Sequence, residues 1–266
     1  MSELYTPEPV QRVIVWRHTL FQTRSKLTGE AAEAAVREGL IHSDFDNWPL
    51  MPEGVEQAEE QVRPEVGRLL DMAGAAIDVC LCSPTLRTRQ TAGIVLRGMG
   101  IPILLMEELR ERNRGKYAYA PDEVSERDPL YKIGGESTRN WRPGGEYAVP
   151  RAQTVEEVID LIDPVVLDMA DRLAPGGTIG ISTHAETMVA MRGIRRLGAR
   201  NDQRYREPLV RDHRNVPQLR TANWVGQVNM DVYERRADGP EMTHFKTLGY
   251  HEGERFETDW IEIVRD

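Results

Sequence analysis

The chain has 266 residues, of which 40% are hydrophobic and 29% are charged, and its net charge at pH 7 is −9. These proportions are ordinary for a globular protein in water, and the length allows a sizeable core. The acidic balance argues against a nucleic acid or an anionic membrane as the main partner. It is only a global value, and a basic pocket inside an acidic shell would still admit an anionic small molecule.

Two cysteines, Cys80 and Cys82, are separated by one residue. On a strand they would share one face with diverging side chains, so we expect two buried thiols and no disulfide. The polar N-terminal segment carries no signal-peptide pattern, and no apolar run approaches the ~20 residues of a membrane span. We therefore expect a cytoplasmic protein without a membrane partner.

Strand-like and helix-like segments alternate along the chain. Apolar runs predict strands, and the segments between them carry apolar residues at helical spacing. The predicted strands are 12–16, 76–83, 101–106 and 178–183, and the predicted helices are 52–73, 85–100, 154–173 and 185–198. Residues 226–235 and 242–250 predict a closing antiparallel pair. This order predicts an α/β three-layer sandwich, with a mostly parallel central sheet and helices on both faces.

Two stretches, 24–51 and 116–152, fit no regular element because they are rich in Gly, Pro and charged residues. Long irregular segments in a compact domain are usually either functional caps or disordered. The chain shows no internal repeat and no low-complexity tract. The simplest interpretation is a single domain over residues 1–266 in which these two insertions cap the site.

Polar residues stand where three of the predicted strands end. The first strand ends in Arg17 and His18, the second in Ser83 with Arg87 one helical turn further on, and the fourth is followed by His184. Ligands of open α/β sheets bind at the carboxyl ends of the strands, so we expect these groups to surround one point. Guanidinium groups match phosphate oxygens, and helix N-termini add N–H donors. The pattern predicts a site for a tetrahedral dianion.

Six short motifs follow one another along the chain. They are RHT (17–19), PLMPEGVEQA (49–58), SPTLRTRQTA (83–92), LRERNRGKYAY (109–119), RPGGE (142–146) and THA (183–185). In this order they resemble the motifs of the histidine phosphatase superfamily, which includes the phosphoglycerate mutases. No single motif is decisive, but six in the same order make the resemblance specific.

The motifs depart from the family pattern at several positions. Thr19 and Ala185 replace the glycines that follow the two histidines, Tyr117 replaces a tryptophan, and Arg24 stands where the family has an asparagine. In the family, the residue after the first histidine offers its backbone carbonyl to the ring nitrogen that does not attack. Any residue has this carbonyl, so Thr19 is compatible with the role. Arg24 would add a positive contact to a more anionic substrate, which makes it a candidate substrate-binding residue.

The resemblance implies a reaction and assigns residues to it. His18 would be the nucleophile that forms a phosphohistidine. Arg17, Arg87 and His184 would hold the phosphoryl oxygens and stabilise the transition state, so His184 also counts as catalytic. Glu111 would protonate the leaving group and then activate water. Because the arginines and the second histidine supply the positive field, we expect no metal and no cofactor.

Several alternatives stay open at this stage. We expect a metal-independent phosphatase of a small phosphorylated metabolite. The alternatives are a phosphomutase of the phosphoglycerate mutase type and a non-catalytic pseudophosphatase that binds a phosphorylated ligand. In the charge run EELRERNR (107–114), Glu107 or Glu108 could be confused with Glu111. Neither the identity of the substrate nor the formation of a homodimer is readable from the sequence.

Overall fold

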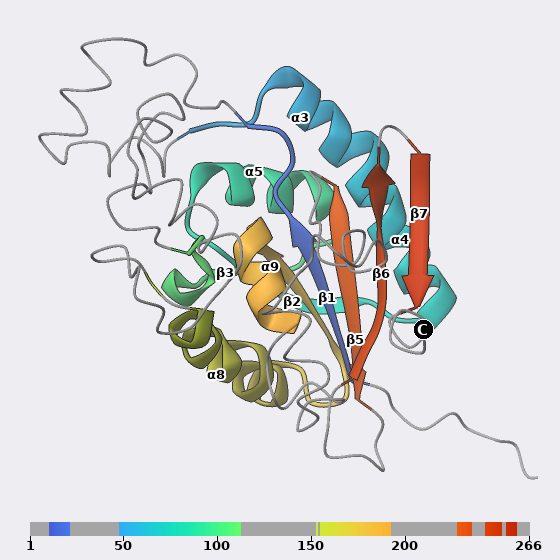
Figure 1. The fold of residues 1–266 in the computed structure, drawn as a ribbon. Helices are drawn as coiled ribbons and strands as arrows, with labels where there is room; N and C mark the ends of the chain where they lie inside the picture. Colours follow the sequence, from blue (N-terminus) through green and yellow to red (C-terminus); the bar gives the residue numbers. More distant parts are fainter. Residues whose placement is uncertain are drawn as a thin grey trace, which may run out of the picture.

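A seven-stranded sheet runs through the described part of the chain. The structure, a computed structural model, describes residues 11–21, 48–112, 153, 155–192, 228–235, 243–251 and 254–259. Its strands are β1 (Gln11–Arg17), β2 (Ile77–Cys82), β3 (Ile103–Leu105), β4 (Thr178–Thr183), β5 (Asn229–Arg235), β6 (Thr243–His251) and β7 (Glu254–Asp259). They are arranged in the order β3-β2-β4-β1-β5-β6-β7 (Figure 1).

The strands β1, β2, β3 and β4 run parallel to one another. β5 is antiparallel to β1, β6 to β5, and β7 to β6, so β6 again runs in the direction of β1. Most strands therefore share one direction, which confirms the predicted mostly parallel sheet. The antiparallel pair expected near the C-terminal end is β5 and β6. The sequence pattern does not predict β7, because ERFETD has too few apolar residues to alternate.

Helices cover both faces of the sheet (Figure 1). One face carries α3 (Pro52–Gln57), α4 (Arg63–Ala73) and α5 (Leu86–Val95), and the other carries α8 (Val155–Leu173) and α9 (Ala185–Arg192). Side chains of β1 alternate between two cores: Val13 and Val15 pack towards α8 and α9, whereas Ile14 and Trp16 pack towards α4 and α5. This period of two is what a strand buried on both faces requires. The predicted three layers are confirmed.

The helices depart from their predicted ranges in two places, and the end of a third helix is not tested. A π-helical turn, η2 (Ala58–Val62), separates α3 from α4 within the predicted helix 52–73. The helix predicted over 85–100 is shorter, because α5 ends at Val95 and the glycines that follow, Gly98 and Gly100, take positive φ angles. Helix α9 is described as far as Arg192, so its predicted end at Gly198 lies outside the described residues.

Several sequence predictions concern parts of the chain that the structure does not describe. Of the two predicted insertions, only residues 48–51 are described, so their capping role and the single-domain organisation stay predictions.

Cys80 and Cys82 are buried and form no disulfide, as predicted. Burial raises the pKa of Cys82 to about 11, which is typical of an inert core thiol. Among the described helices, none is long and apolar enough to cross a bilayer.

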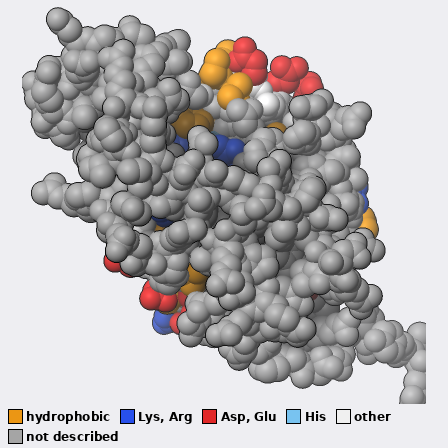
Figure 2. All heavy atoms as spheres, in the orientation of Figure 1, with side chains coloured by type: hydrophobic (Ala, Val, Ile, Leu, Met, Phe, Trp, Pro, Cys, Tyr) orange, Lys and Arg blue, Asp and Glu red, His pale blue; other side chains and the backbone are white. Residues whose placement is uncertain are grey.

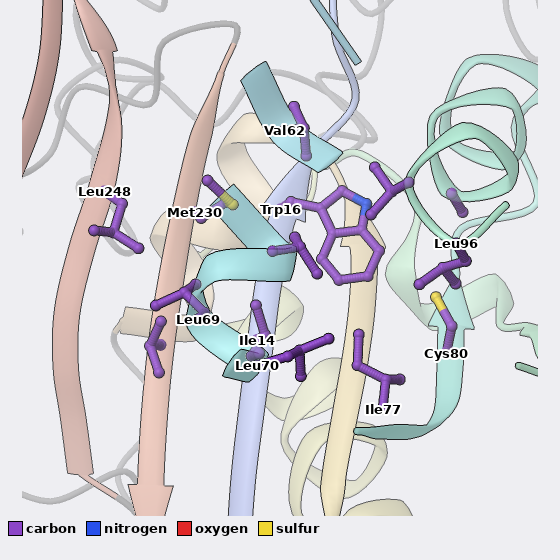
Figure 3. Close-up of a cluster of buried hydrophobic side chains, with 14 of the residues drawn as sticks. Ile14, Trp16, Val62, Leu69, Leu70, Ile77, Cys80, Leu96, Met230 and Leu248 are labelled. Carbon is purple, nitrogen blue, oxygen red and sulfur yellow. The ribbon is translucent and has the colours of Figure 1, made fainter. Parts of the chain in front are cut away.

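Trp16 is buried between β1 and the helices α4 and α5 (Figure 3). Its ring lies against Gly180 on the neighbouring strand β4, where an added Cβ would come within 2.7 Å of Cη2 of the indole. Real Cβ atoms essentially never approach this closely, so β4 needs glycine at this position. The contact ties together the two strands that end in the histidines.

The first prediction tests this packing. Replacing Gly180 with alanine should lower the free energy of unfolding by about 1–3 kcal/mol, because the added methyl group overpacks the core. Replacing Gly67 with alanine is the matched control: it lies in α4, has nothing within 4 Å of its added Cβ, and should stabilise by about 0.5–1 kcal/mol. Urea unfolding measures both. Equal effects of the two substitutions would contradict the proposed contact.

Candidate active site

The ends of three parallel strands meet at one edge of the sheet. β4 lies between β1 and β2, with Arg17 opposite Thr183. Backbone hydrogen bonds continue this register beyond the strands, from the amide of His18 to the carbonyl of Thr183 (2.9 Å) and from the amide of Ser83 to the carbonyl of Ser182 (3.0 Å). The structure therefore brings together the strand ends from which the sequence predicts a site.

Two buried histidines form the centre of this site. The ring centroids of His18 and His184 lie 5.1 Å apart at an interplanar angle of 67°. Nδ1 of His18 lies 2.8 Å from the carbonyl oxygen of Thr19. A carbonyl only accepts, so Nδ1 carries the proton of the neutral ring and Nε2 keeps its lone pair. This is the carbonyl contact expected of the residue after the first histidine, and threonine makes it.

The second histidine has the opposite tautomer. Nδ1 of His184 lies 3.4 Å from Nη2 of Arg87, and Nε2 lies 2.9 Å from Oγ of Ser83. Because the guanidinium only donates, Nδ1 of the neutral ring accepts and the Nε2–H donates to the serine. Arg87 is itself only 1% exposed. The group predicted to bind phosphate thus lies directly beside the second histidine.

Burial lowers the pKa of both rings. Desolvation, followed by the charges of Arg17 and Arg87, holds the pKa of His18 well below the usual 6.5, although the hydrogen bond to Thr19 opposes the shift. Desolvation also dominates at His184, whose pKa is lowered further by the charge of Arg87 and by smaller contributions from His18, Arg17 and Arg110. Both rings are therefore neutral at pH 7. A neutral imidazole is the form that can attack phosphorus.

Thr19 anchors the backbone that follows His18. Its hydroxyl donates to the carbonyl of Gly54 at 2.6 Å, and its amide donates to Oγ1 of Thr91 at 3.3 Å. Thr91 in turn donates to the carbonyl of Arg87 at 2.9 Å. An added Cβ at Gly54 would lie 1.8 Å from the carbonyl oxygen of Leu20, so only glycine allows this approach. The threonine that departs from the family motif thereby links the segment after His18 to α3 and α5.

Two glutamines bind the segment after His18 and the segment that pairs with it at Leu50. Oε1 of Gln57 accepts from the amide of Leu20 at 3.1 Å, and Oε1 of Gln90 accepts from the amide of Leu50 at 2.8 Å. Phe21 and Leu50 form an isolated antiparallel bridge. Gln57 belongs to the motif PLMPEGVEQA (49–58) and Gln90 to the motif SPTLRTRQTA (83–92). No local pattern identifies these contacts, because the amides that the two glutamines bind lie 37 and 40 residues away in the chain.

Glu111 follows the 3₁₀ turn η3 (Glu107–Leu109) and lies against the first turn of α9, the helix that begins directly after His184. Its Oε1 accepts from the amide of Glu186 at 3.1 Å and from the amide of Arg112 at 3.2 Å. The backbone before it is also fixed against the strand end, because the hydroxyl of Thr183 donates to the carbonyl of Leu109 at 2.7 Å. The carboxylate predicted to act as acid and base is thus hydrogen-bonded to the first turn of α9, the helix that follows the second histidine.

The neighbours of Glu111 have other partners. Glu107, which the sequence does not separate from Glu111, pairs with Arg110, and its side chain is 72% exposed. A second ion pair lies nearby: Nε of Arg112 donates to Oε2 of Glu186 at 2.8 Å, and Nη1 of Arg112 donates to the carbonyl of Gln153 at 3.2 Å. No local pattern predicts it, because the partners are 74 residues apart.

The surface near this edge combines positive charge with apolar groups. Figure 2 shows basic and hydrophobic side chains next to each other where β1 ends in Figure 1.

The predicted substrate contact Arg24 lies outside the described residues. Across the described ranges, no three side chains of His, Cys, Asp or Glu come close enough to hold a metal ion.

Two solved structures share this fold. A phosphoserine phosphatase from Entamoeba histolytica, in complex with 3-phosphoglyceric acid, superposes with a TM-score of 0.58 at 14% identity, covering 91% of this chain and 98% of that one. A mycobacterial glucosyl-3-phosphoglycerate phosphatase superposes with a TM-score of 0.52 at 13% identity, covering 85% and 90%. At such identities the likeness shows the fold alone.

Sequence comparison identifies relatives more directly. A 2,3-bisphosphoglycerate-dependent phosphoglycerate mutase from Methylobacterium sp. (strain 4-46) is 22% identical over 129 residues, or 47% of this chain and 60% of the relative. The family model of the histidine phosphatase superfamily (branch 1) matches residues 30–211. The match begins after His18, so the place of that residue in the site rests on the geometry above. Since the match covers more than half of the chain, the protein belongs to the histidine phosphatase superfamily.

Proposed function

We propose that this protein is a metal-independent phosphatase that hydrolyses a small phosphomonoester through a phosphohistidine on His18. The observation that carries the proposal is the state of the His18 ring. It is buried beside two guanidinium groups, its pKa is lowered, and its Nδ1–H is held by the carbonyl of Thr19. Nε2 is therefore unprotonated at neutral pH, next to groups that attract a phosphate dianion.

The reaction takes place in two displacements. In the first, the Nε2 lone pair of His18 attacks phosphorus, the P–N bond forms, the ester P–O bond breaks, and the leaving alkoxide takes a proton from Glu111. In the second, water attacks phosphorus and gives its proton to Glu111, the P–N bond breaks, and inorganic phosphate leaves. Each displacement concentrates charge on the non-bridging oxygens, where Arg17 and Arg87 stabilise it.

Binding of the substrate would change the protonation states of Glu111 and His184. The two amides that donate to Glu111 stabilise its carboxylate, which suits the base of the second displacement. The first displacement needs a proton on Glu111, and the approach of a phosphate dianion favours that proton because like charges repel. The same dianion favours protonation of His184, whose Nδ1 would then become a donor to phosphate.

A phosphomutase is the second candidate. It is supported by the curated relative, which is named a phosphoglycerate mutase. The solved structures show the fold alone, and hydrolysis is favoured instead by the departure from the family pattern at Tyr117 and by the predicted insertion over 116–152. Release of inorganic phosphate, measured against interconversion of 2- and 3-phosphoglycerate, separates the two. A pseudophosphatase would do neither.

Replacing His18 with asparagine should reduce phosphate release by at least about 10³-fold, because the nucleophile is lost. A chelator should leave the wild-type rate unchanged. The measurement is steady-state phosphate release with and without the chelator, with circular dichroism to check the fold. Retained activity in a folded variant would contradict the role of His18, and a strict requirement for a divalent ion would contradict the metal-independent mechanism.

Replacing Glu111 with glutamine should lower kcat for glycerol 3-phosphate by about 10²–10⁴-fold and affect p-nitrophenyl phosphate much less. The reason is that an alkoxide needs a proton as the bond breaks, whereas nitrophenolate hardly does. Glu107→Gln is the matched control, because this carboxylate is exposed and paired with Arg110, and it should leave both rates unchanged. An equal loss on both substrates would mean that Glu111 is not the leaving-group acid.

Thr19 should act as a positioning residue. Thr19→Val keeps the shape but removes the donor to the carbonyl of Gly54, so it should cost about 1–3 kcal/mol of unfolding free energy and lower kcat by about 10-fold. Thr19→Ser keeps the hydroxyl, so it should retain most of the unfolding free energy and most of kcat. If valine and serine variants behaved alike, the hydroxyl contact would have no part in positioning His18.

The neutral state of the two rings is testable without substrate. Proton-detected nitrogen NMR should show both His18 and His184 neutral at pH 6.5, with the proton on Nδ1 of His18 and on Nε2 of His184. Each should gain a proton only as the pH falls well below 6.5, since burial disfavours the charged ring. The same histidines in the urea-unfolded chain provide the reference. A midpoint at or above the reference value in the folded protein would refute the assignment.

A further inference from the structure

We propose that Phe21 and Trp48 form an aromatic wall of the substrate pocket, and that this wall selects phosphomonoesters whose alcohol carries a planar apolar group beside the ester oxygen. The inference rests on the proposed function, since it concerns the group that leaves when His18 is phosphorylated. It is independent of the six motifs, because neither aromatic residue has been assigned a role by them.

Phe21 contacts both His18, the proposed nucleophile, and Arg87, a proposed phosphate-binding residue. Its ring meets the ring of His18 edge-on, with centroids 4.8 Å apart and an interplanar angle of 89°. The guanidinium carbon of Arg87 lies 4.7 Å from the centroid of the same ring, over its face. A phosphoryl group held between His18 and Arg87 therefore has an aromatic ring as its immediate neighbour. An ester group that extends from that phosphoryl group on this side meets the ring first.

Trp48 extends this surface away from the reacting atoms. Its ring is stacked on that of Phe21 at a centroid distance of 6.4 Å and an interplanar angle of 29°. Both side chains are only partly buried, so each keeps accessible surface. The two rings form one apolar surface that begins at the phosphate site.

The wall is held in place by the backbone. The bridge between Phe21 and Leu50 fixes the two segments that carry the rings against each other. Gln57 and Gln90 bind the amides of Leu20 and Leu50 from the helix side. A surface that is ordered before the ligand arrives loses little conformational entropy on binding, so it discriminates well between ligands.

The chemistry of this wall favours one kind of alcohol. Aromatic side chains pair favourably with planar apolar groups in offset-stacked or edge-to-face geometry. The hydroxyl groups of a polyol placed against the same ring faces lose hydrogen bonds to water and gain none from the rings. A phosphomonoester of an arylmethyl or similar alcohol should therefore be preferred to a phosphomonoester of glycerol.

The test compares benzyl phosphate with glycerol 3-phosphate, because both release an alkoxide and differ mainly in the group that would meet the wall. We expect wild-type protein to have the higher kcat/KM for benzyl phosphate. Trp48→Ala should lower kcat/KM for benzyl phosphate by about 3- to 10-fold and change that for glycerol 3-phosphate by less than about 2-fold. Trp48→Phe keeps a ring and should retain most of the preference. Trp48 is the residue replaced, since Phe21 lies against the nucleophile.

A binding measurement separates this inference from the proposed function. Benzylphosphonate and methylphosphonate cannot be hydrolysed, and calorimetry should show tighter binding of the benzyl compound to wild type and to Trp48→Phe, but not to Trp48→Ala. This pattern without turnover would support the wall and contradict the phosphatase. Turnover with equal binding of the two phosphonates, or with equal losses on both esters in Trp48→Ala, would overturn the wall and leave the phosphatase intact.

Discussion

The parallel pairing of β4 with both β1 and β2 is the constraint on which the site depends. It places the residues that follow three strands at the same edge of the sheet, although they are separated by up to 166 positions between His18 and His184. The register is itself protected by the packing of Trp16 on Gly180. Two buried rings and two guanidinium groups can share one point only if these strands stay aligned. The packing of the hydrophobic core thus holds the two guanidinium groups close together, although their like charges repel each other.

The same arrangement explains why the cluster is stable without substrate. Arg17 and Arg87 are both cations, and a protonated histidine between them would add a third positive charge at a buried position. Burial keeps both rings neutral, and the hydrogen bonds to Thr19, Ser83 and Arg87 fix opposite tautomers. In the proposed reaction, a dianion would enter a site that already has positive charge and needs little reorganisation. The lowered pKa values, which arise first from burial and then from the neighbouring arginines, keep this cluster free of additional positive charge.

Much of the fold and of the central site is predictable from the sequence, because buried parallel strands appear as apolar runs and the residues at their ends are polar. The prediction fails where the decisive contacts join distant residues. The hydroxyl of Thr19 binds Gly54 and Arg112 pairs with Glu186, and neither contact leaves a local pattern. The edge strand β7 has no apolar alternation to reveal it. Thr19 shows a further limit: as a departure from a motif it looks like a loss, yet in the structure it adds an anchor.

The central claim is that His18 carries the phosphoryl group during turnover, and rapid acid-free quenching with ³²P-labelled substrate tests it most directly. We expect one labelled phosphate per chain, stable in base and labile in acid, and located by mass spectrometry on His18, with no label on the His18→Asn variant. A burst of label on a different residue would contradict the account, as would complete turnover with no labelled protein at any quench time.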